Sequence, residues 1–402
     1  MKFIEFGFES QLDEGLEAMG FSEATPVQES AIPLILENKD ILVSAQTGTG
    51  KTAAFLLPTL NNILKNKYKG VSTLILVPTR ELAMQIDQQI QGLGYFLNVS
   101  SIPVYGGGEG AVWDTQKKAF KGGVDIVVAT PGRLMAHMEM GYVNFKNIKH
   151  LILDEADRML DMGFITDITN IVAKLPVDRQ TLLFSATMPD RIKKFADKLQ
   201  RNPERVNLST SKPAEGVLQA AYLVEENDKY DLIASLLDEK DLQSVIVFAS
   251  AKLKVNTIVR TLKKRKMNVE GIHSDLDQKQ REEVLLGFKN RKTNILVATD
   301  VISRGIDINN IDLVVNFDVP NDPEDYVHRV GRTARAKSEG VALTFINSDS
   351  KEQYNFKRIE DLIEDEVFKV PLPHEVGVSP KYNPSAKPPR KSFKKKFIKR
   401  RK

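Results

Sequence analysis

The chain has 402 residues, of which 42% are apolar and 27% are charged, and its formal net charge is +4. That length exceeds one ordinary domain and indicates two or three. No apolar run is long enough to cross a membrane as a helix, and the first residues show no signal-peptide pattern. The chain contains no cysteine, which excludes disulfides and thiolate metal sites. We therefore expect a cytoplasmic protein from a reducing compartment.

The positive charge is gathered at the C-terminal end. Residues 387–402 contain ten basic residues and no acid, so residues 1–386 carry 47 basic and 53 acidic residues and a net charge of −6. A basic arm on a mildly acidic body is typical of proteins that bind a polyanion. A disordered end that only keeps the protein soluble would have the same composition, so both interpretations stay open.

Short apolar, β-branched runs alternate with helical patterns in two series along the chain. Near-continuous apolar strands between helices are typical of parallel sheets covered on both faces, so the pattern predicts an α/β fold with two domains. The runs are 41–44, 73–77, 124–129, 151–153 and 181–184 in the first series, and 244–248, 294–298, 313–316 and 341–345 in the second.

The boundaries between these parts follow from composition. Residues 207–216 are short, polar and contain proline and glycine, which favours a hinge linker. From about residue 370 the sequence turns to proline, lysine and serine, which is typical of disorder. We predict one domain at 1–206, a linker at 207–216, a second domain at 217–369 and a disordered basic tail at 370–402.

Residues 45–52 read AQTGTGKT and lie between an apolar strand pattern and an apolar helical pattern. A glycine-rich turn at such a place points backbone N–H groups and the positive end of a helix at one spot, where polyphosphate is the natural ligand. Lys51 would reach the β- and γ-phosphates, and the Thr52 hydroxyl would hold Mg²⁺. The strict pattern has glycine where this chain has Ala45, and a plain turn between strand and helix is the competing interpretation.

Polar residues recur directly after the predicted strands. Because ligands of open parallel sheets bind at the carboxyl ends of the strands, this recurrence predicts one site along that edge. Arg80, Arg133 and the glycines at 106–108 suit sugar-phosphate, although each alone also fits an ordinary loop. The polar segments are 78–82, 130–133, 154–157 and 185–187 in the first half, and 299–300 in the second.

Two adjacent carboxylates, Asp154 and Glu155, follow the apolar run 151–153. Asp154 stands where phosphate-loop NTPases place the acid that holds Mg²⁺. Glu155 could orient the attacking water or accept its proton. A helix N-cap followed by a first-turn acid is the alternative, but the turn at 45–52 favours catalysis.

Four of the eight residues in 328–335, with the sequence HRVGRTAR, are basic when histidine is counted. On a helix, Arg332 and Arg335 share a face through their i,i+3 spacing. A solvated basic face would explain the run. The same guanidinium groups could instead reach a γ-phosphate as arginine fingers, which would make catalysis depend on closure of the two domains.

Together and in this order, the motifs resemble the DEAD-box ATP-dependent RNA helicases of superfamily 2. The likeness runs from Phe3 to about Phe345 and includes the literal Asp-Glu-Ala-Asp at 154–157. The compact body and short tail make the chain most similar to the bacterial RhlE-type subgroup. The matching motifs are 45–52, 78–82, 130–133, 154–157, 185–187, 299–307 and 328–335.

The resemblance implies two tandem RecA-like domains and an RNA-stimulated ATPase. Such an enzyme couples ATP hydrolysis and domain closure to local unwinding or remodelling of RNA duplexes or RNA–protein complexes. Two positions depart from the family pattern: Ala24 replaces a usual proline and Ala334 a usual glycine. We expect a looser local turn from the first change and retained activity with the second.

The resemblance also implies roles for individual residues. Gln28 would read the adenine edge, Phe3 would stack on the base and Asp307 would contact the ribose. The implied catalytic residues are Lys51, Asp154, Glu155, Arg332 and Arg335. The implied metal ligands are Thr52 and Asp154. The residues implied for ATP binding are Phe3, Gln28, Ala45, Gln46, Thr47, Gly48, Thr49, Gly50, Lys51, Thr52 and Asp307.

RNA would lie across both domains, and Ser185 and Thr187 would couple hydrolysis to strand separation. Most RNA contacts would go to phosphate and ribose, which predicts little sequence preference and strong salt dependence. Phe393 and Phe397, set among lysines, could stack on bases, so removal of residues 381–402 should weaken RNA binding. The implied RNA contacts are Pro78, Thr79, Arg80, Gly107, Thr130, Arg133, Gln278, Arg281 and Thr299.

Two other functions compete with this interpretation. A nucleotide-gated RNA clamp would hydrolyse ATP only to release RNA, with little unwinding, and a DNA helicase of the same superfamily would act on another nucleic acid. We assign His273 and Trp113 structural roles. We expect a monomeric body with no membrane partner, and ribosomal or RNA-decay proteins are the candidate protein partners.

Overall fold

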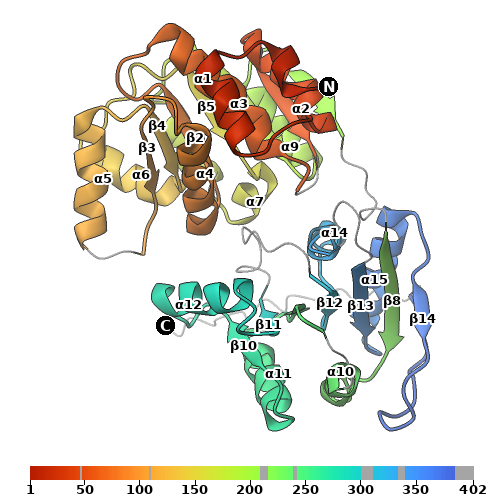
Figure 1. The fold of residues 1–402 in the computed structure, drawn as a ribbon. Coiled ribbons are helices and arrows are strands. Elements are labelled where there is room, and N and C mark those ends of the chain that lie inside the picture. The colour runs from red at the N-terminus through yellow and green to blue at the C-terminus, as the bar shows by residue number, and fades with distance from the viewer. Residues whose placement is uncertain are drawn as a thin grey trace, which may run out of the picture. The chain divides into compact units, whose positions relative to one another are not determined.

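The computed structural model describes residues 1–45, 48–107, 110–208, 216–238, 242–299, 311–333 and 340–384. The chain divides into two units, and the change from one to the other falls inside the predicted linker at 207–216. In the described ranges, each unit is built around its own seven-stranded sheet (Figure 1). The predicted α/β class with two parallel-sheet units is therefore confirmed.

All neighbouring strands of the first sheet are parallel. Helical crossovers join the parallel strands, and their order in the sheet differs from their order in the chain. Across the sheet the strands are β3 (Ser101–Val104), β4 (Ile126–Ala129), β2 (Thr73–Leu76), β5 (His150–Leu153), β6 (Gln180–Ser185), β1 (Ile41–Ser44) and β7 (Glu204–Asn207).

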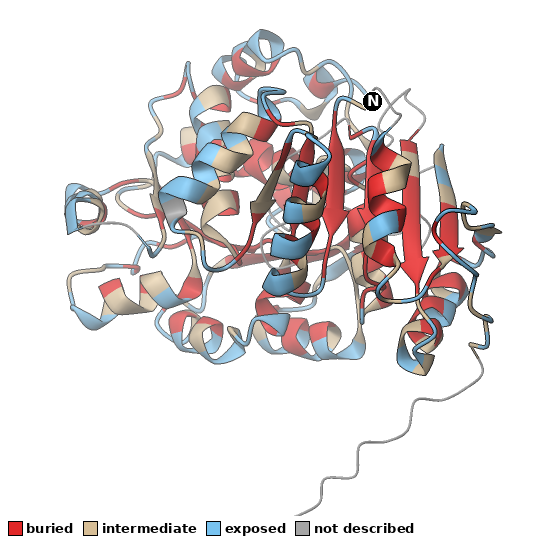
Figure 2. Ribbon diagram, turned by 90° about the horizontal axis from the view of Figure 1, so that it is seen from below, coloured by how far each residue is buried: buried red, intermediate tan, exposed pale blue. Residues whose placement is uncertain are grey.

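Alternate residues of these strands pack into two separate apolar cores, one on each face of the sheet. In β1, Ile41 and Val43 belong to one core and Leu42 to the other, so both faces of the sheet are buried. Figure 2 shows the pattern, with buried strands between helices that keep exposed outer faces. The first core is covered by η1 (Phe3–Phe6), α1 (Ser10–Ala18), α2 (Pro26–Leu36), α3 (Lys51–Asn66) and α4 (Arg80–Leu93). The second is covered by α5 (Gly110–Gly122), α6 (Pro131–Glu139), α7 (Ala156–Asp161), α8 (Ile165–Val172) and α9 (Asp190–Leu199).

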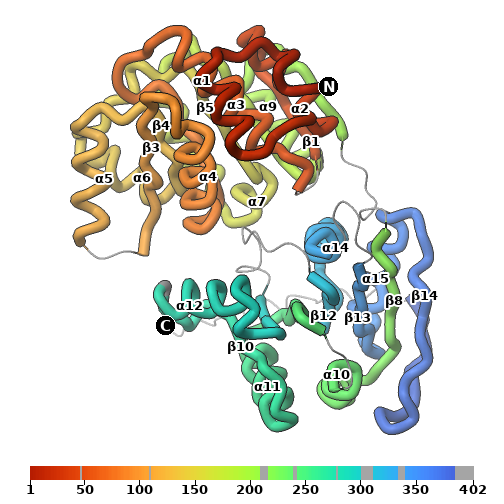
Figure 3. Tube along the Cα trace, in the orientation of Figure 1, coloured from red at the N-terminus to blue at the C-terminus, as the bar shows by residue number. Residues whose placement is uncertain are grey.

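The second sheet has the same strand order as the first when the strands of each are numbered from its own start. Its strand pairs are also parallel. Figure 3 follows β8 between β13 and β14, as the pairing requires. Across the sheet the strands are β10 (Val269–Ile272), β11 (Ile295–Ala298), β9 (Val245–Phe248), β12 (Leu313–Asn316), β13 (Gly340–Ile346), β8 (Val217–Leu223) and β14 (Phe368–Val370).

The helices of the second unit pack on this sheet. Leu232 and Val255, from two different helices, join strand residues such as Val247 in one apolar core. None of the helices in the described part of either unit combines the length and apolar character that a membrane span requires. The helices are α10 (Lys229–Asp238), α11 (Lys252–Lys264), α12 (Gln278–Lys289), α14 (Pro323–Val330) and α15 (Ser350–Ile363).

The segment after β14 corrects one prediction. Disorder was expected from residue 370, but residues 381–384 are held against α15. The Tyr382 hydroxyl donates to a Glu360 carboxylate oxygen at 3.1 Å, and the Asn383 N–H donates to Gln353 Oε1 at 2.6 Å. The composition of this segment is that of a linker, but these contacts, together with the donation from Gln353 Nε2 to the Lys381 carbonyl at 3.0 Å, bind it to the helix. The remaining tail, residues 385–402, lies outside the described residues.

Candidate functional site

The carboxyl edge of the first sheet has two halves. β5, β6 and β1 are neighbours, and so are β3, β4 and β2. The first half therefore gathers the segments that begin with Ala45, Asp154 and Ser185. The second half gathers those that contain Arg80, Gly107 and Arg133. Sequence positions that are more than a hundred residues apart thus meet along one edge, as predicted for an open parallel sheet.

The loop between β1 and α3 is held by its own lysine. Gly48 and Gly50 have φ of 84° and 92°, in the left-handed region that favours glycine. Lys51 is the first residue of α3, is only 8% exposed, and its Nζ donates to the Ala45 carbonyl at 2.6 Å. The positive charge and the N-terminus of α3 therefore meet at this loop, which is the arrangement that binds phosphate.

Gln28 ties a second element to the same loop. Its Oε1 accepts the Thr25 N–H at 2.9 Å, and its Nε2 donates to the Gly50 carbonyl at 3.1 Å. A Cβ built on Gly50 would lie 2.5 Å from Gln28 Nε2, so no larger residue fits there without a shift. The amide retains one N–H and one acceptor position for a ligand. Its predicted contact with adenine stays a prediction.

Phe3 lies inside the first core. Its ring is 3% exposed and packs against Phe6 and Phe21, with ring centres 6.0 and 5.8 Å apart. The structure thus gives this ring a packing role that fixes the N-terminal segment beside α2. Its predicted stacking on a base stays a prediction.

Asp154 is a buried carboxyl with little local compensation. It is 3% exposed, and the Glu155 N–H donates to its Oδ1 at 2.9 Å. Burial raises the pKa of Asp154 to about 7, because the positive charge of Lys51 offsets only part of the desolvation. A carboxylate held in this way gains from any cation that enters the site.

Glu155 has a strained backbone. Its φ of 51° is in the left-handed region, and it is the residue before α7. Such a conformation costs a non-glycine residue about 1 kcal/mol or more and is frequent at functional sites. The Arg158 guanidinium is 3.2 Å from Glu155 Oε2 and fixes the direction of the carboxylate.

The donor set at this half of the edge fits Mg²⁺. Magnesium prefers carboxylate and hydroxyl oxygens and keeps several waters. Asp154 supplies the first kind of oxygen, and Thr52, the second residue of α3, supplies the second. The raised pKa of Asp154 shows that its carboxylate lacks compensating charge, which a divalent cation would provide.

Asp157, to which the sequence analysis assigned no role, connects two of the predicted segments. Its Oδ2 accepts the Ala186 N–H at 3.2 Å, the Thr187 N–H at 3.0 Å and the Thr187 hydroxyl at 3.0 Å. Its own N–H donates to Ser185 Oγ at 3.3 Å. The segment after β5 is therefore bound directly to the segment after β6. The acid two residues after Glu155 in the 154–157 motif was the available signal.

The second half of the edge carries the two arginines. Thr79 caps α4, since its hydroxyl accepts the Leu82 N–H at 3.3 Å, and Arg80 begins that helix. The guanidinium carbon of Arg80 lies 4.4 Å from the centre of the Tyr105 ring. Arg133, in the first turn of α6, donates from Nε to Gln116 Oε1 at 3.0 Å. Both guanidinium groups are thus held at the edge of the sheet.

The other residues of the predicted RNA set in this unit lie close to the arginines in the chain. Pro78 is buried, Thr130 precedes α6 and is half-buried, and Gly107 is exposed with φ of 86°. Outside the described residues lie Gln46, Thr47, Asp307 and Arg335, together with the side chain of Gln278.

In the second unit, two arginines of the segment 328–335 have different roles. Arg329 anchors its helix, and Arg332 is a candidate arginine finger. Arg329 is 4% exposed, and its Nη1 donates to Asn316 Oδ1 and to the Asp318 carbonyl, both at 3.0 Å. This contact joins α14 to the end of β12. Arg332 follows α14, and its side chain is 6% exposed.

Two predicted RNA contacts of this unit also lie near strand ends. Thr299 follows β11, and its N–H donates to the Ile272 carbonyl at 3.4 Å. Arg281, on α12, donates from Nη2 to the Ser274 carbonyl at 2.9 Å. Its Nε has no hydrogen-bond partner within the described ranges.

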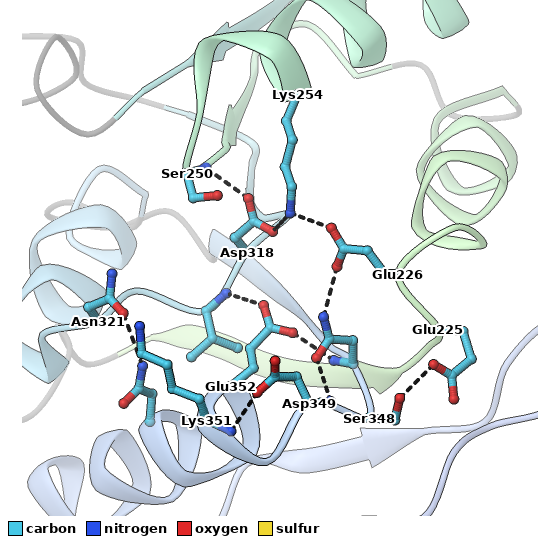
Figure 4. A pocket seen from close by; sticks show the side chains of 13 residues that line it. Glu225, Glu226, Ser250, Lys254, Asp318, Asn321, Ser348, Asp349, Lys351 and Glu352 are labelled. Atoms are coloured by element: carbon cyan, nitrogen blue, oxygen red, sulfur yellow. Dashed lines mark hydrogen bonds and ion pairs between the residues drawn. The ribbon is translucent and has the colours of Figure 1, made fainter. Parts of the chain in front are cut away.

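The second unit also has a polar cavity of ≈ 580 Å³ at the carboxyl ends of β8, β9, β12 and β13 (Figure 4). Its walls carry lysines and acids that pair with one another. Lys254 contacts both Glu226 and Asp318. Beside them, Lys229 is fully buried and lies 3.1 Å from Glu352. These strands correspond to β1, β2, β5 and β6 of the first unit.

Sequence profiles match both units. The profile of the DEAD/DEAH box helicases matches residues 25–195, and that of the helicase conserved C-terminal domain matches residues 228–337. The chain is 44% identical over 346 residues to the ATP-dependent RNA helicase CshA of Listeria monocytogenes, which covers 86% of this chain and 66% of the relative. It is also 44% identical to the DEAD-box ATP-dependent RNA helicase CshA of Geobacillus kaustophilus, over 86% of this chain and 73% of the relative.

A solved structure of S. cerevisiae Dbp5 bound to RNA and ADP BeF3 is similar over both units. The TM-score is 0.83 with 31% identity, covering 92% of this chain and 95% of that one. This likeness confirms the tandem RecA-like architecture. The chain spans about two thirds of the length of the curated relatives it matches. Those relatives are CshA proteins, so the predicted RhlE-type subgroup gains no support from them.

Proposed function

This chain belongs to the DEAD-box ATP-dependent RNA helicases, and on that premise we propose how its residues perform the reaction. The first unit binds ATP at the loop 45–52 and carries out hydrolysis. RNA binds along the neighbouring half of the same sheet edge. The observation that carries the proposal is that Lys51 follows β1 while Asp154 and Glu155 follow β5, the two strands that flank β6 at the same edge of the sheet.

Within the ATP site each residue has a physical task. The backbone N–H groups at the start of α3 and the Lys51 ammonium bind the phosphates. Glu155, whose carboxylate is directed by Arg158, orients the attacking water and accepts its proton. Bound Mg²⁺, held by Asp154 and Thr52, would neutralise charge that develops on the phosphates. Gln28 recognises adenine through the two amide positions that the protein leaves open.

The second unit completes the catalytic centre when the units close on ATP and RNA. Arg332 and Arg335 then stabilise the charge on the transferred phosphoryl group as arginine fingers. Arg329 supports this role, because its hydrogen bonds to the end of β12 fix the helix that precedes Arg332. Hydrolysis then depends on closure, and closure depends on RNA.

Asp157 joins the hydrolytic acid to the segment that senses RNA. Its carboxylate holds the Ala186 and Thr187 N–H groups, so a displacement of 154–157 after hydrolysis moves 185–187 with it. We assign Ser185 and Thr187 to this coupling.

RNA contacts go mainly to phosphate and ribose. Arg80 and Arg133 are held at the edge of the sheet by aromatic rings and supply charge, while exposed Gly107 permits close approach of the backbone. Sequence preference is then weak and binding falls steeply with salt. Removal of the basic tail at 385–402 should weaken RNA binding at low salt without changing ATP turnover at saturating RNA. Equal RNA affinity with and without the tail would exclude it as an RNA-binding arm.

The finer identity follows the relatives. We propose that the protein acts as a helicase of the CshA kind, because the CshA relatives are 44% identical over most of this chain. Ribosomal or RNA-decay proteins are its candidate partners, and a monomeric body is consistent with a complete set of motifs in one chain.

The test is ATP turnover by the full chain without nucleic acid, with single-stranded RNA and with DNA of the same sequence. We expect strong stimulation by RNA alone, together with displacement of a short RNA duplex. Equal rates in all three conditions would contradict closure-dependent catalysis. Stimulation without strand displacement would favour the clamp, and equal stimulation by DNA would favour a DNA helicase.

A further inference from the structure

The ring of Trp113 contacts the arginine that the proposed function gives to RNA. Trp113 lies on α5, and the guanidinium carbon of Arg133 is 4.2 Å from the centre of its ring. The same ring stacks on His137, with ring centres 3.9 Å apart and an interplanar angle of 14°. A guanidinium over an indole face is attracted by the ring quadrupole, and tryptophan is the best aromatic partner for this contact. The contact limits the directions that a long side chain can take.

A hydrogen-bond network fixes the same arginine from another side. Gln116 Oε1 lies 3.0 Å from Arg133 Nε and 2.9 Å from His137 Nε2. Arginine only donates, so the amide oxygen must face both nitrogens, and His137 must donate through Nε2. The other ring nitrogen, Nδ1, then accepts from the Tyr142 hydroxyl. The chain of contacts therefore has one consistent set of donors and acceptors.

The network is anchored on the neighbouring strand. Gln116 Nε2 lies 3.3 Å from the carbonyls of both Pro103 and Tyr105, at the end of β3. The Tyr105 ring in turn lies under the guanidinium of Arg80. Gln116 thus links the backbone of Tyr105, whose ring supports Arg80, to the guanidinium of Arg133.

His137 stacks on Trp113 and carries no charge that would repel Arg133. It is fully buried, and burial first and the charge of Arg133 second lower its pKa to about 4. The imidazole is therefore neutral at physiological pH. Arg133 Nη2 is buried and has no hydrogen-bond partner in the part of the chain that the structure describes, although the residue as a whole is only half-buried.

We propose that Trp113 is a positioning residue for RNA binding. Its ring, together with Gln116, fixes the Arg133 guanidinium in the direction from which the remaining N–H groups bind RNA phosphate. The inference rests on the proposed RNA contact of Arg133. It adds that the affinity for RNA depends on a residue that does not itself touch RNA.

The test measures RNA-stimulated ATP turnover by the full chain. Trp113→Ala should raise the RNA concentration for half-maximal stimulation by about 3- to 10-fold, because cation–π attraction and orientation are lost together. The KM for ATP and the turnover at saturating RNA should stay within about twofold, and Trp113→Phe should restore most of the affinity. Tyr95→Ala, at an aromatic residue of the same unit that is 81% exposed, is the matched control and should change nothing.

Arg133→Ala separates the two proposals. It should weaken RNA binding at least as much as Trp113→Ala, and the double variant should be no weaker than Arg133→Ala alone. Normal affinity in Trp113→Ala with weakened affinity in Arg133→Ala would overturn the positioning role only. Normal affinity in both variants would overturn the RNA contact of Arg133 itself.

Fluorescence tests the contact directly, because Trp113 is the only tryptophan of the chain. Loss of the guanidinium in Arg133→Ala uncovers the indole face, so emission of the free protein should shift to longer wavelength. Identical spectra for the parent and Arg133→Ala would overturn the stack in solution. Unfolding curves of Trp113→Phe that match the parent show that its affinity is measured on folded protein.

Discussion

The two sheets share one strand order, yet the lysines at equivalent places have opposite surroundings. Lys51 begins α3 after the first strand of its sheet, and Lys229 begins α10 after the first strand of the other. Lys51 donates to a backbone carbonyl at the edge of a glycine loop. Lys229 is fully buried and pairs with Glu226 at 3.1 Å, Glu352 at 3.1 Å and Asp318 at 3.6 Å.

The carboxylates opposite these lysines differ in the same way. Asp154 follows β5, and burial outweighs the charge of Lys51, so its pKa rises to about 7. Asp318 follows β12, the equivalent strand. Burial would raise its pKa too, but Lys229 and Lys254 together hold it below its usual range. Asp154 is therefore short of nearby positive charge, whereas the protein supplies that charge to Asp318.

The charge balance at the strand ends distinguishes a binding site from a structural network. In the second unit, Lys254 pairs with Glu226 and Asp318 in Figure 4, so the protein itself supplies the counter-charges of these acids. In the first unit, the turn after β1 carries glycines where the turn after β8 carries acids. The positive charge near Asp154 does not offset the burial of its carboxylate. A nucleotide with its magnesium ion has the charges that would complete the balance there. The same scaffold is therefore a site in one unit and a structural ion-pair network in the other.

The largest effect should come from Glu155→Gln. This change removes the base but keeps the size of the side chain, so ATP turnover at saturating RNA should fall by about 100-fold or more. Glu225→Gln, at an exposed acid that follows β8 in the second unit, should leave turnover unchanged and is the control. Steady-state hydrolysis with both nucleotide and RNA in excess is the measurement. A fall of similar size in both variants would contradict the assignment of chemistry to the first unit.

Removal of each lysine should sharpen the contrast. Lys229→Met leaves buried acids unpaired and should lower the free energy of unfolding of the second unit by about 3 kcal/mol. Lys51→Met should change the stability of the first unit little but abolish ATP binding. Denaturation followed by circular dichroism reports both units, while Trp113 emission reports the first unit alone. If Lys51→Met destabilised its unit as strongly as Lys229→Met, the two lysines would be equivalent after all.

The pH dependence of Asp154 should separate the two carboxylates. A pKa raised in the folded chain means that the native state keeps a proton that the unfolded chain loses, so this group lowers stability as pH rises from about 4 to about 7. Asp154→Asn removes the effect. Its stability relative to the parent should be about 2 to 3 kcal/mol greater at pH 8 than at pH 5.

Urea unfolding followed by Trp113 emission at both pH values measures this difference within the first unit. Asp318→Asn is the matched control in the second unit, followed by circular dichroism. Because the pKa of Asp318 is lowered, its variant should lose stability relative to the parent as pH rises through the acid range. A pH-independent difference for Asp154→Asn would show that its carboxyl is not short of charge.

The smallest of these effects belongs to Asp157. Asp157→Asn weakens charge-assisted hydrogen bonds to Ala186 and Thr187, so the first unit should lose about 1 to 2 kcal/mol of stability. RNA duplex displaced per ATP hydrolysed should fall more than hydrolysis itself. Equal reductions in the two rates would mean that the contact only stabilises the fold.

The sequence predicted most strands that are buried on both faces. It missed the edge strands β3, β7, β10 and β14, and also β8, which lies inside its sheet but exposes Leu218. The predicted strand at 41–44 agrees with β1, and 313–316 agrees with β12. β3 contains Pro103 and lies at an edge of its sheet, and β10 contains Glu270 and Gly271. Edge strands keep a solvent-exposed side, so they need no continuous apolar run and give a weak signal.

The candidate site was predictable where a motif states its chemistry. The loop at 45–52 and the acids at 154–155 were both predicted as parts of the site from their sequence motifs. Gln116 and Trp113 could not be predicted in this way, because an isolated glutamine or tryptophan on a helix has no distinctive pattern. Their positions depend on how α5 packs beside β3 and α6, which is a property of the tertiary structure. Asp157 is intermediate, since the motif contains it but does not reveal its bond to 185–187.

We infer that only one of the two equivalent strand-end sites binds nucleotide. Isothermal titration of the full chain with a non-hydrolysable ATP analogue and Mg²⁺, in the presence of RNA, tests it most directly. We expect one nucleotide per chain, with binding lost in Lys51→Met. Two nucleotides per chain, or binding that survives Lys51→Met, would contradict it.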